Sequence, residues 1–447
     1  MHAPIGGLLE AAAPIDRQCD RLISIPFLLL RAATAGGALA TGFVQTFVFA
    51  RILSPELFSV FIVVGAVGYT LWLAELGLPS VLFVNLRVQH LARRRDAATA
   101  HQATALIVFY AAGAIAAAAI CFIVALARPD ATLTLASELA LFLSSIALNL
   151  PWTALRSISI AVDLFVFFES LELIRRTAVV AALLAMLAGL PLAVYLIAAN
   201  LLWAVLFATA AGRLIGRGAL SRQWRGAPRQ LVTFLRTNRR ATARSSLGAL
   251  SNGFLLLFPY YLVPALFGLG AAPIVLEVTF RVFRGGCGIF AAICDLAVPG
   301  QTRALAARDG DRLIRTTLAV MALCCVPAAI ACGLLIFAGG PLFSYLLRTA
   351  ATVPPAVVPI LTVLLLAGVL QTVAEALLQY TGYFRSLAFT GIAVAAGALG
   401  ATAFAFLAGL GLVGFLAAYA AVYAVGAIAL AVAAWRGPIR AAQQAVS

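Results

Sequence analysis

The sequence contains no lysine, and only three of its 447 residues are histidine. These are His2, His90 and His101, which fall in the N-terminal tail and in one predicted loop, so they do not converge on a catalytic or metal site. The seven cysteines include no CxxC pair and no Cys/His spacing typical of zinc ligands. The sequence therefore predicts no metal site, no cofactor and no enzymatic activity.

Apolar residues, by contrast, are in large excess. They make up 64% of the chain, and the mean hydropathy is +1.06; soluble domains are about 45–50% apolar. A membrane-spanning helix needs about 20 mainly apolar residues, and runs of this length recur along the whole chain. We therefore predict an all-α polytopic membrane protein with about 12 transmembrane helices. The predicted helices are Ile25–Ala50, Leu57–Leu86, Ala103–Ala127, Leu133–Leu155, Phe168–Gly189, Pro191–Leu214, Ser245–Phe267, Pro273–Pro299, Leu313–Phe337, Pro355–Tyr380, Phe384–Ala408 and Leu410–Trp435.

All 31 basic residues are arginine, and most of them cluster in alternate loops. The basic loops carry Arg87 and Arg93 to Arg95, then Arg213 to Arg244, then Arg303, Arg308, Arg312 and Arg315, and finally Arg436 and Arg440. This asymmetry follows the positive-inside rule, and it predicts a multi-pass protein of the bacterial inner (cytoplasmic) membrane with both termini in the cytoplasm. It also argues against a nucleic-acid partner, which would need the basic residues on one accessible face.

The longest basic stretch, Arg213–Arg244, divides the predicted helices into two sets of six. We therefore expect two six-helix lobes related as parallel pseudo-repeats, and such pairs commonly enclose a substrate site near the midplane of the membrane. The predicted parts are a cytoplasmic tail (1–24), an N-lobe (25–214), a basic cytoplasmic linker (215–244), a C-lobe (245–436) and a C-terminal cytoplasmic tail (437–447).

The basic linker mixes arginines with apolar residues. Leu231, Val232, Phe234 and Leu235 lie among Arg229, Arg236, Arg239 and Arg240. This pattern is typical of a basic helix that lies on anionic lipid headgroups. A solvated linker without a partner is the alternative, and the sequence leaves both open.

Four stretches carry a likeness to a known family. Phe49–Phe58 and Leu73–Leu78 resemble the opening hairpin of oligosaccharide flippases, the polysaccharide-transporter branch of the multidrug/oligosaccharidyl-lipid/polysaccharide (MOP) superfamily. Leu171–Arg176 resembles the start of the family's fifth helix, and Val263–Gly268 resembles its junction of helices seven and eight. Ser59 departs from the pattern, since the family usually has glycine there.

This resemblance implies a transporter that flips a polyprenyl-diphosphate-linked oligosaccharide across the inner membrane by alternating access, for the biosynthesis of surface polysaccharide such as O-antigen or exopolysaccharide. The implied partners are the lipid-linked oligosaccharide, membrane lipids, H⁺ or Na⁺ as a coupling ion, and a polysaccharide polymerase or ligase.

Ionisable residues inside the predicted eighth helix are the strongest functional candidates, because a charge in the bilayer is costly and needs a partner. Glu277, Arg281 and Arg284 follow the spacing i, i+4 and i+7, which places them on one helical face. A guanidinium binds a diphosphate through two parallel hydrogen bonds and stays charged. We therefore interpret Arg281 and Arg284 as diphosphate ligands. In the alternative interpretation Glu277 neutralises Arg281 as a structural pair, which would leave Arg284 unmatched.

A second predicted pair joins the first two helices. Their turn lies near residues 52–55, so Arg31 and Glu75 should lie at one depth, and Arg31 becomes a third candidate for the diphosphate. Gly77 and Pro79 favour a kink next to this pair. A purely structural salt bridge between Arg31 and Glu75 stays open.

The remaining candidates concern coupling and motion. Asp295 and Glu375 could carry a coupled proton or cation, since buried carboxylates titrate upwards when desolvated; the alternative is that they snorkel or cap. Pro259 and Pro264 are expected to break the seventh helix and to act as a hinge of alternating access. The residues Glu169, Glu172, Arg175 and Arg176 are interpreted as structural ion pairs at the start of a helix.

Two other functions compete with the flippase. A drug/cation antiporter of the MOP type should have carboxylates in its cavity, whereas the midplane charges here are mostly arginine. A membrane-embedded transferase should have catalytic His or Asp clusters at a membrane face, and the three histidines do not provide one.

Overall fold

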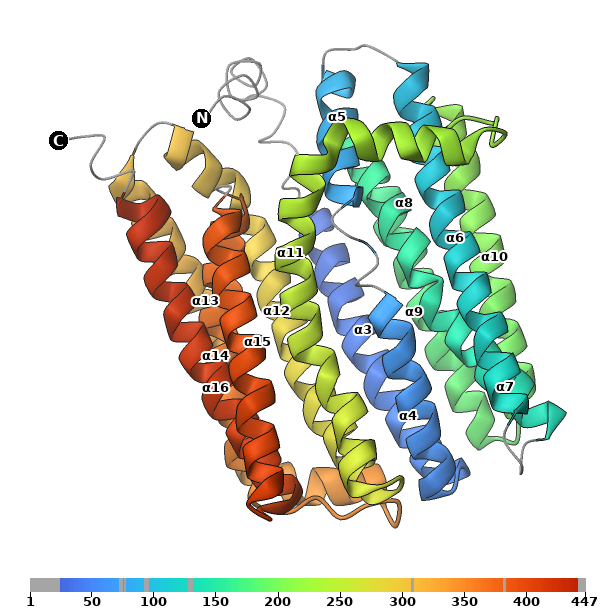
Figure 1. Ribbon diagram of the computed structural model, residues 1–447, viewed down its shortest axis with the longest axis vertical. Helices are drawn as coiled ribbons and strands as arrows, with labels where there is room; N and C mark the ends of the chain where they lie inside the picture. The colour runs from blue at the N-terminus through green and yellow to red at the C-terminus, as the bar shows by residue number, and fades with distance from the viewer. Residues whose placement is uncertain are drawn as a thin grey trace. The chain divides into compact units, whose positions relative to one another are not determined.

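The computed structural model describes residues 25–71, 75, 78–91, 96–127, 132–306, 309–380 and 383–440. Every regular element in these ranges is a helix (Figure 1). In chain order they are α3 (Ile25–Ile52), α4 (Pro55–Thr70), α5 (Leu78–Leu91), α6 (Ala97–Leu126), α7 (Leu133–Ala147), α8 (Asn149–Ala161), α9 (Phe165–Leu187), α10 (Leu192–Gly216), α11 (Ala227–Phe267), α12 (Ala271–Ala306), α13 (Gly310–Leu347), α14 (Val357–Tyr380), α15 (Phe384–Leu407), α16 (Gly411–Ala434) and the π-helical turn η3 (Trp435–Ile439).

Eight helical segments within the described ranges are long and apolar enough to cross a membrane. Two shorter apolar helices, Pro55–Thr70 and Gly253–Phe267, add to them. Helices α9 and α12 have the length of a span but carry the charged residues that the sequence had singled out. Together these segments correspond to the twelve predicted spans.

Side-chain caps start several of these helices where the sequence offers a Ser, Thr or Asp. The hydroxyl of Ser54 accepts a hydrogen bond from the backbone N–H of Leu57, and Pro55 occupies the first turn of α4. Asp96 caps α6 through the N–H of Ala98. This hydrogen bond has the largest effect on the pKa of the Asp96 carboxyl, and it lowers that pKa. A hydrogen bond from the Thr99 hydroxyl lowers the pKa further. Such caps satisfy N–H groups that have no partner inside the helix.

Two predicted spans are interrupted rather than continuous. The second predicted helix is divided into α4, which ends at Thr70, and α5, which begins at Leu78. The fourth is divided at Leu148, between α7 and α8. Pro151 accounts for the second interruption, because proline has no N–H and its ring would clash with the carbonyl oxygen of Ala147 four residues earlier.

Helix α11 corrects two expectations. The basic stretch expected to form a linker before Ser245 is helical from Ala227 onward and continues directly into the seventh span. Pro259 and Pro264 lie inside this helix, so the prediction that they break it is wrong. Proline is tolerated in membrane helices when neighbouring groups satisfy the backbone carbonyls that it frees. The hinge role of the two prolines stays a prediction.

The described residues form two compact units. Among the described residues, unit 1 comprises 25–37, 78–91, 96–127, 132–182 and 190–243, and unit 2 comprises 38–71, 75, 183–189, 244–306, 309–380 and 383–440. The second half of α3 and the whole of α4 thus belong to the same unit as α12 to α16. The lobe boundaries predicted from the sequence stay predictions.

Within unit 2, small residues bring helices close to α12. A Cβ on Gly285 would collide with the side chain of Leu39 in α3, and a Cβ on Gly286 would collide with that of Leu365 in α14. Below these glycines, Phe290 and Cys294 of α12 form a buried cluster with Cys324 of α13. The close approach of α3 and α14 to α12 places the charged face of α12 against its neighbours.

The orientation in the membrane can be tested with single cysteines in a cysteine-free background. We expect a membrane-impermeant maleimide to label Thr349→Cys in intact cells, because Thr349 is exposed between α13 and α14 on the predicted periplasmic side. Gln223→Cys is equally exposed but lies in the basic stretch, so it should react only after the membrane is permeabilised. The reverse labelling pattern would overturn the predicted orientation.

Candidate functional site

The polar centre of unit 2 is a cluster around one carboxylate, that of Glu277 in α12. Arg281, one turn later, donates to Oε1 of Glu277 through both Nε, at 2.7 Å, and Nη2. Arg284 reaches Oε2 through Nη2, at 3.3 Å. Tyr260 of α11 donates its hydroxyl to the same Oε2, at 2.6 Å. We refer to Glu277, Arg281, Arg284 and Tyr260 as the α12 cluster.

The two guanidinium groups of this cluster have different surroundings. Arg281 also donates to the carbonyl oxygen of Gly42 in α3. Arg284 donates to the Tyr260 hydroxyl at 2.6 Å, and its guanidinium carbon lies 5.1 Å from the ring centre of Tyr69 and 5.0 Å from that of Tyr260. Arg284 is thus the guanidinium with the looser ion pair and with neutral neighbours.

The α12 cluster carries one positive charge more than negative charge, since a single carboxylate serves two guanidinium groups. At a rise of about 1.5 Å per residue, Arg281 lies about 15 Å from the start of α12, half the thickness of a hydrocarbon core of about 30 Å. The Glu277 side chain is 5% exposed, whereas those of Arg281 and Arg284 are 16% and 23% exposed. The excess charge is therefore on the more accessible part of the cluster.

Gly42 of α3 lets Arg281 approach the α3 backbone closely. A Cβ at this position would lie 3.3 Å from both Cδ and Nη1 of Arg281. With no side chain at Gly42, the arginine can lie against the α3 backbone and donate to its carbonyl oxygen. The same carbonyl oxygen also accepts a hydrogen bond from the Thr46 hydroxyl at 3.2 Å.

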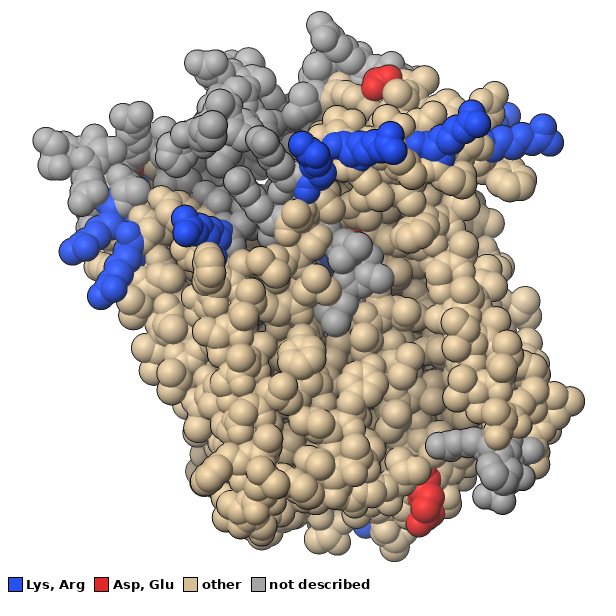
Figure 2. All heavy atoms as spheres, in the orientation of Figure 1, with Lys and Arg blue, Asp and Glu red and all other residues tan. Residues whose placement is uncertain are grey.

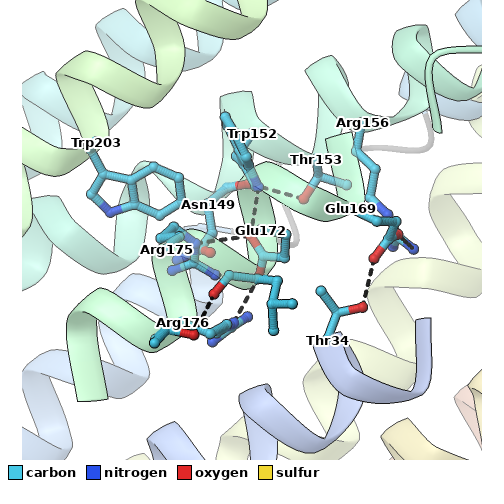
Figure 3. A network of polar contacts seen from close by, with 12 residues as sticks. Thr34, Asn149, Trp152, Thr153, Arg156, Glu169, Glu172, Arg175, Arg176 and Trp203 are labelled. Atoms are coloured by element: carbon cyan, nitrogen blue, oxygen red, sulfur yellow. Dashed lines mark hydrogen bonds and ion pairs between the residues drawn. The ribbon is translucent and has the colours of Figure 1, made fainter. Parts of the chain in front are cut away.

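Unit 1 contains a second cluster, centred on α9 (Figure 3). Glu172 accepts hydrogen bonds from Arg175 at 2.9 and 2.5 Å, from Arg176 at 2.7 Å and from the indole N–H of Trp152 at 2.9 Å. The guanidinium of Arg175 lies 4.5 Å from the ring centre of Trp203 in α10. We call these residues the α9 cluster.

A neighbouring carboxylate in unit 1 is also shared. Glu169 accepts from Thr34 of α3 at 2.8 Å and from Arg156 of α8 at 2.9 Å (Figure 3). These contacts join three helices, and the pairs Glu172–Arg175 and Glu172–Arg176 lie within one helix at i, i+3 and i, i+4. Such an arrangement fits the structural role that the sequence suggested for these residues.

Comparison with known proteins rests on structure alone, because no protein-family model and no curated protein matches the sequence. An inward-facing multidrug resistance MATE family transporter of the MOP superfamily superimposes with a TM-score of 0.68 at 16% identity, covering 94% of this chain and 100% of that one. A eukaryotic MATE transporter gives 0.62 at 15% identity, covering 95% and 99%. A MOP superfamily transporter from Pyrococcus furiosus gives 0.61 at 15% identity, covering 94% and 99%.

The chain has the MOP transporter fold.

The MOP fold confirms the predicted class, an all-α polytopic membrane protein of about twelve helices in two six-helix lobes. At these identities the likeness establishes the fold and leaves the cargo to be argued from the residues. In this chain the second and eighth predicted spans are α4–α5 and α12, and α12 carries the cluster with the excess positive charge.

The remaining site residues predicted from the sequence are Arg31, Glu75, Asp295 and Glu375. The side chains of Arg31 and Asp295 lie outside the described residues, so the Arg31–Glu75 pair and the role of Asp295 stay predictions. Glu75 lies between α4 and α5 in the sequence and is partly buried. Glu375 lies on α14, close enough to the Cys287 thiol of α12 for an electrostatic interaction. Coupling by either carboxylate stays a prediction.

The structure also corrects the alternative interpretation of the eighth span. If Glu277 is a structural partner of Arg281, Arg284 is not left unmatched, because the second carboxylate oxygen contacts it. The question is no longer which arginine is paired. It is what balances the single excess charge.

Sequence reasoning missed Tyr260 and Gly42. A signal for Tyr260 was present: α11 and α12 are joined at Gly268 to Gly270, and residues 260 and 277 lie at nearly equal distances from that turn along the chain. Antiparallel neighbours therefore place them at the same depth. No comparable signal exists for Gly42, whose contact with Arg281 joins residues 239 positions apart.

Proposed function

We propose that the protein is a transporter of the bacterial inner membrane that flips a polyprenyl-diphosphate-linked oligosaccharide for surface-polysaccharide biosynthesis. The observation that carries the proposal is the shared carboxylate: in the α12 cluster two guanidinium groups in the middle of a span have one negative partner. The diphosphate of the lipid carrier supplies the missing negative charge. Its lipid tail stays in the bilayer during the movement, and alternating access exchanges the side to which the cluster opens.

The chemistry of the cluster fits a diphosphate. Arg284 uses Nη2 for Glu277 and Tyr260 and Nε for the carbonyl oxygen of Phe280, so the two N–H groups of Nη1 remain as charged donors to phosphate oxygens. The Tyr260 hydroxyl and the ring of Tyr69 fix the guanidinium without neutralising it. The MOP transporter from Pyrococcus furiosus is described as having a binding pocket of reverse polarity that suggests a different function. A positive cluster in this chain supports an anionic rather than a cationic cargo.

A drug/cation antiporter remains the second candidate, since several of the similar structures are multidrug MATE transporters. Glu75 and Glu375 are the carboxylates that would serve it. The sign of the α12 cluster argues against it, because a cationic drug near Arg281 and Arg284 would meet repulsion.

The test compares two neutralised clusters of the same composition. The variant Glu277→Gln/Arg281→Gln/Arg284→Gln removes one carboxylate and two guanidinium groups from α12. The matched control Glu172→Gln/Arg175→Gln/Arg176→Gln removes the same groups from α9. Replacing a whole buried ionic network by neutral groups is often tolerated, so both should fold and insert.

Both variants would be assayed for export of surface polysaccharide in a strain that lacks the protein, with membrane levels measured by blot. We expect the α9 variant to export near the wild-type level and the α12 variant to export almost nothing at equal abundance. Normal export by the α12 variant would show that its charges serve only one another, and the proposal would be wrong. Export of a cationic dye that depends on the α12 cluster would favour the antiporter instead.

A further inference from the structure

The cytoplasmic end of unit 1 carries the most basic stretch of the chain. Nine arginines lie between Arg213 and Arg244, and no acidic residue occurs between Glu172 and Glu277. The stretch comprises the end of α10, a connecting segment and the first turns of α11, all in unit 1 as far as Ala243. No carboxylate within this part of the sequence neutralises the arginines, so the neutralising negative charge has to come from another group.

This basic stretch is fixed to unit 1 and is not a free linker. Ser221 exchanges backbone hydrogen bonds with the Thr104 hydroxyl of α6, at 2.9 and 3.3 Å, and its own hydroxyl contacts His101 at 3.2 Å. Leu231 and Phe234 of α11 are buried, at 8% and 1% exposure. The first turns of α11 therefore bury one apolar face within the protein.

The opposite face of the same turns is basic. Arg229, Arg236 and Arg239 are exposed at i, i+7 and i+10, which aligns them along one side of the helix. Figure 2 shows their row of basic atoms running along this segment. Two large apolar side chains are exposed in the same region, Trp224 at 66% and Val232 at 46%.

We propose that this face of α11 binds the headgroups of anionic phospholipids in the cytoplasmic leaflet. A guanidinium binds the phosphate of a headgroup with a two-pronged fork, and a basic segment at the membrane surface gains about 1 kcal/mol per Arg from anionic lipid. Trp224 adds an indole, which favours the boundary between headgroups and acyl chains. A merely solvated linker needs neither the buried apolar face nor the exposed tryptophan. The lipid anchors the segment that leads from the sixth span into the seventh.

The proposal can be tested with the full chain reconstituted in phosphatidylcholine vesicles that contain trace spin-labelled phosphatidylglycerol or spin-labelled phosphatidylcholine. Electron spin resonance reports the fraction of each label that is immobilised by the protein, and their ratio is the lipid preference. The test variant is Arg229→Gln/Arg236→Gln/Arg239→Gln. The matched control is Arg312→Gln/Arg436→Gln/Arg440→Gln, which removes three exposed arginines of the predicted cytoplasmic side from other elements.

We expect the wild type and the control to prefer phosphatidylglycerol by at least about threefold, because anionic headgroups attract a basic segment at the membrane surface. The test variant should lose most of this preference, and Arg229→Lys/Arg236→Lys/Arg239→Lys should keep most of it, because the charge remains. Raising the salt concentration should weaken the preference, since screening is strong at an exposed surface.

Three outcomes would overturn the proposal. The first is an unchanged preference in the glutamine variant at equal reconstitution, checked by a normal elution profile. The second is an equal loss in the control, which would assign the preference to overall charge. The third is that neither salt nor the glutamine variant reduces the immobilised phosphatidylglycerol, while a soluble polyphosphate binds to this face and needs the same arginines. That result would make the face a site for a soluble anion.

Discussion

Arg284→Gln is expected to fold and insert like the wild type and to reduce export of surface polysaccharide by about a hundredfold. Arg281 alone satisfies Oε1 of Glu277 through two donors, so the remaining pair is neutral and stable. The substitution removes only the excess charge, which the proposed function assigns to the diphosphate. Loss of one partner from a buried charged contact costs about 2–5 kcal/mol, and about 1.4 kcal/mol corresponds to a tenfold change. The measurement is export per unit of membrane-inserted protein.

Two further variants at matched positions sharpen this prediction. Arg284→Lys keeps the charge but loses the planar fork, so its export should lie between those of the wild type and Arg284→Gln. Arg176→Gln removes the corresponding second guanidinium of the α9 cluster and should leave export near normal. If Arg176→Gln and Arg284→Gln reduced export equally, the diphosphate contact could not be assigned to α12.

Glu277→Ala is expected to destabilise the protein more than any other single substitution in the α12 cluster. It leaves two partly buried guanidinium groups without a negative partner and removes the acceptor of the Tyr260 hydroxyl. Breaking a buried ion pair from one side costs about 3–5 kcal/mol, a large share of the about 5–15 kcal/mol by which proteins are stable. We expect a steep fall in the amount of monodisperse protein extracted from membranes.

This experiment includes a compensating variant and a control variant. Adding Arg281→Gln and Arg284→Gln to a Glu277→Gln variant should restore the abundance, because no uncompensated charge remains. Glu56→Ala removes an exposed carboxylate at the first turn of α4 and should change stability only slightly. Normal abundance of Glu277→Ala would mean that the guanidinium groups do not depend on this carboxylate, in conflict with the observed contacts.

The positions of the spans could be read from the sequence because lipid imposes a simple requirement. Every backbone polar group in the hydrocarbon core must be satisfied internally, so an apolar run of sufficient length becomes a helix. The ends were less predictable: α13 continues to Leu347, ten residues past the predicted Phe337, and α11 begins eighteen residues before Ser245. The extra turns of α11 lie in a basic segment without a hydropathy signal, and those of α13 contain Gly339, Gly340 and Pro341, which are typical of a helix end.

Within the candidate site, helical periodicity predicted which residues share one face of α12. It could not predict which residues of neighbouring helices contact that face. The spacing of Glu277, Arg281 and Arg284 is a property of α12 alone, and their shared face followed from it. The contacts of Glu277 with Tyr260 and of Arg281 with Gly42 come from other helices. Which residue of a neighbouring helix meets a given side chain depends on crossing angle and on small residues that let backbones approach.

By itself the sequence determined the class of the protein: its membrane-spanning helices and the set of charges that had to be explained inside the bilayer. Each of these follows from local composition, because transfer of a residue into lipid depends on that residue and its immediate neighbours. Only the tertiary structure decided how the charges are balanced. Whether Arg284 is free, paired with Glu277 or held by Tyr260 depends on contacts between α11, α12 and α4, which no local pattern encodes.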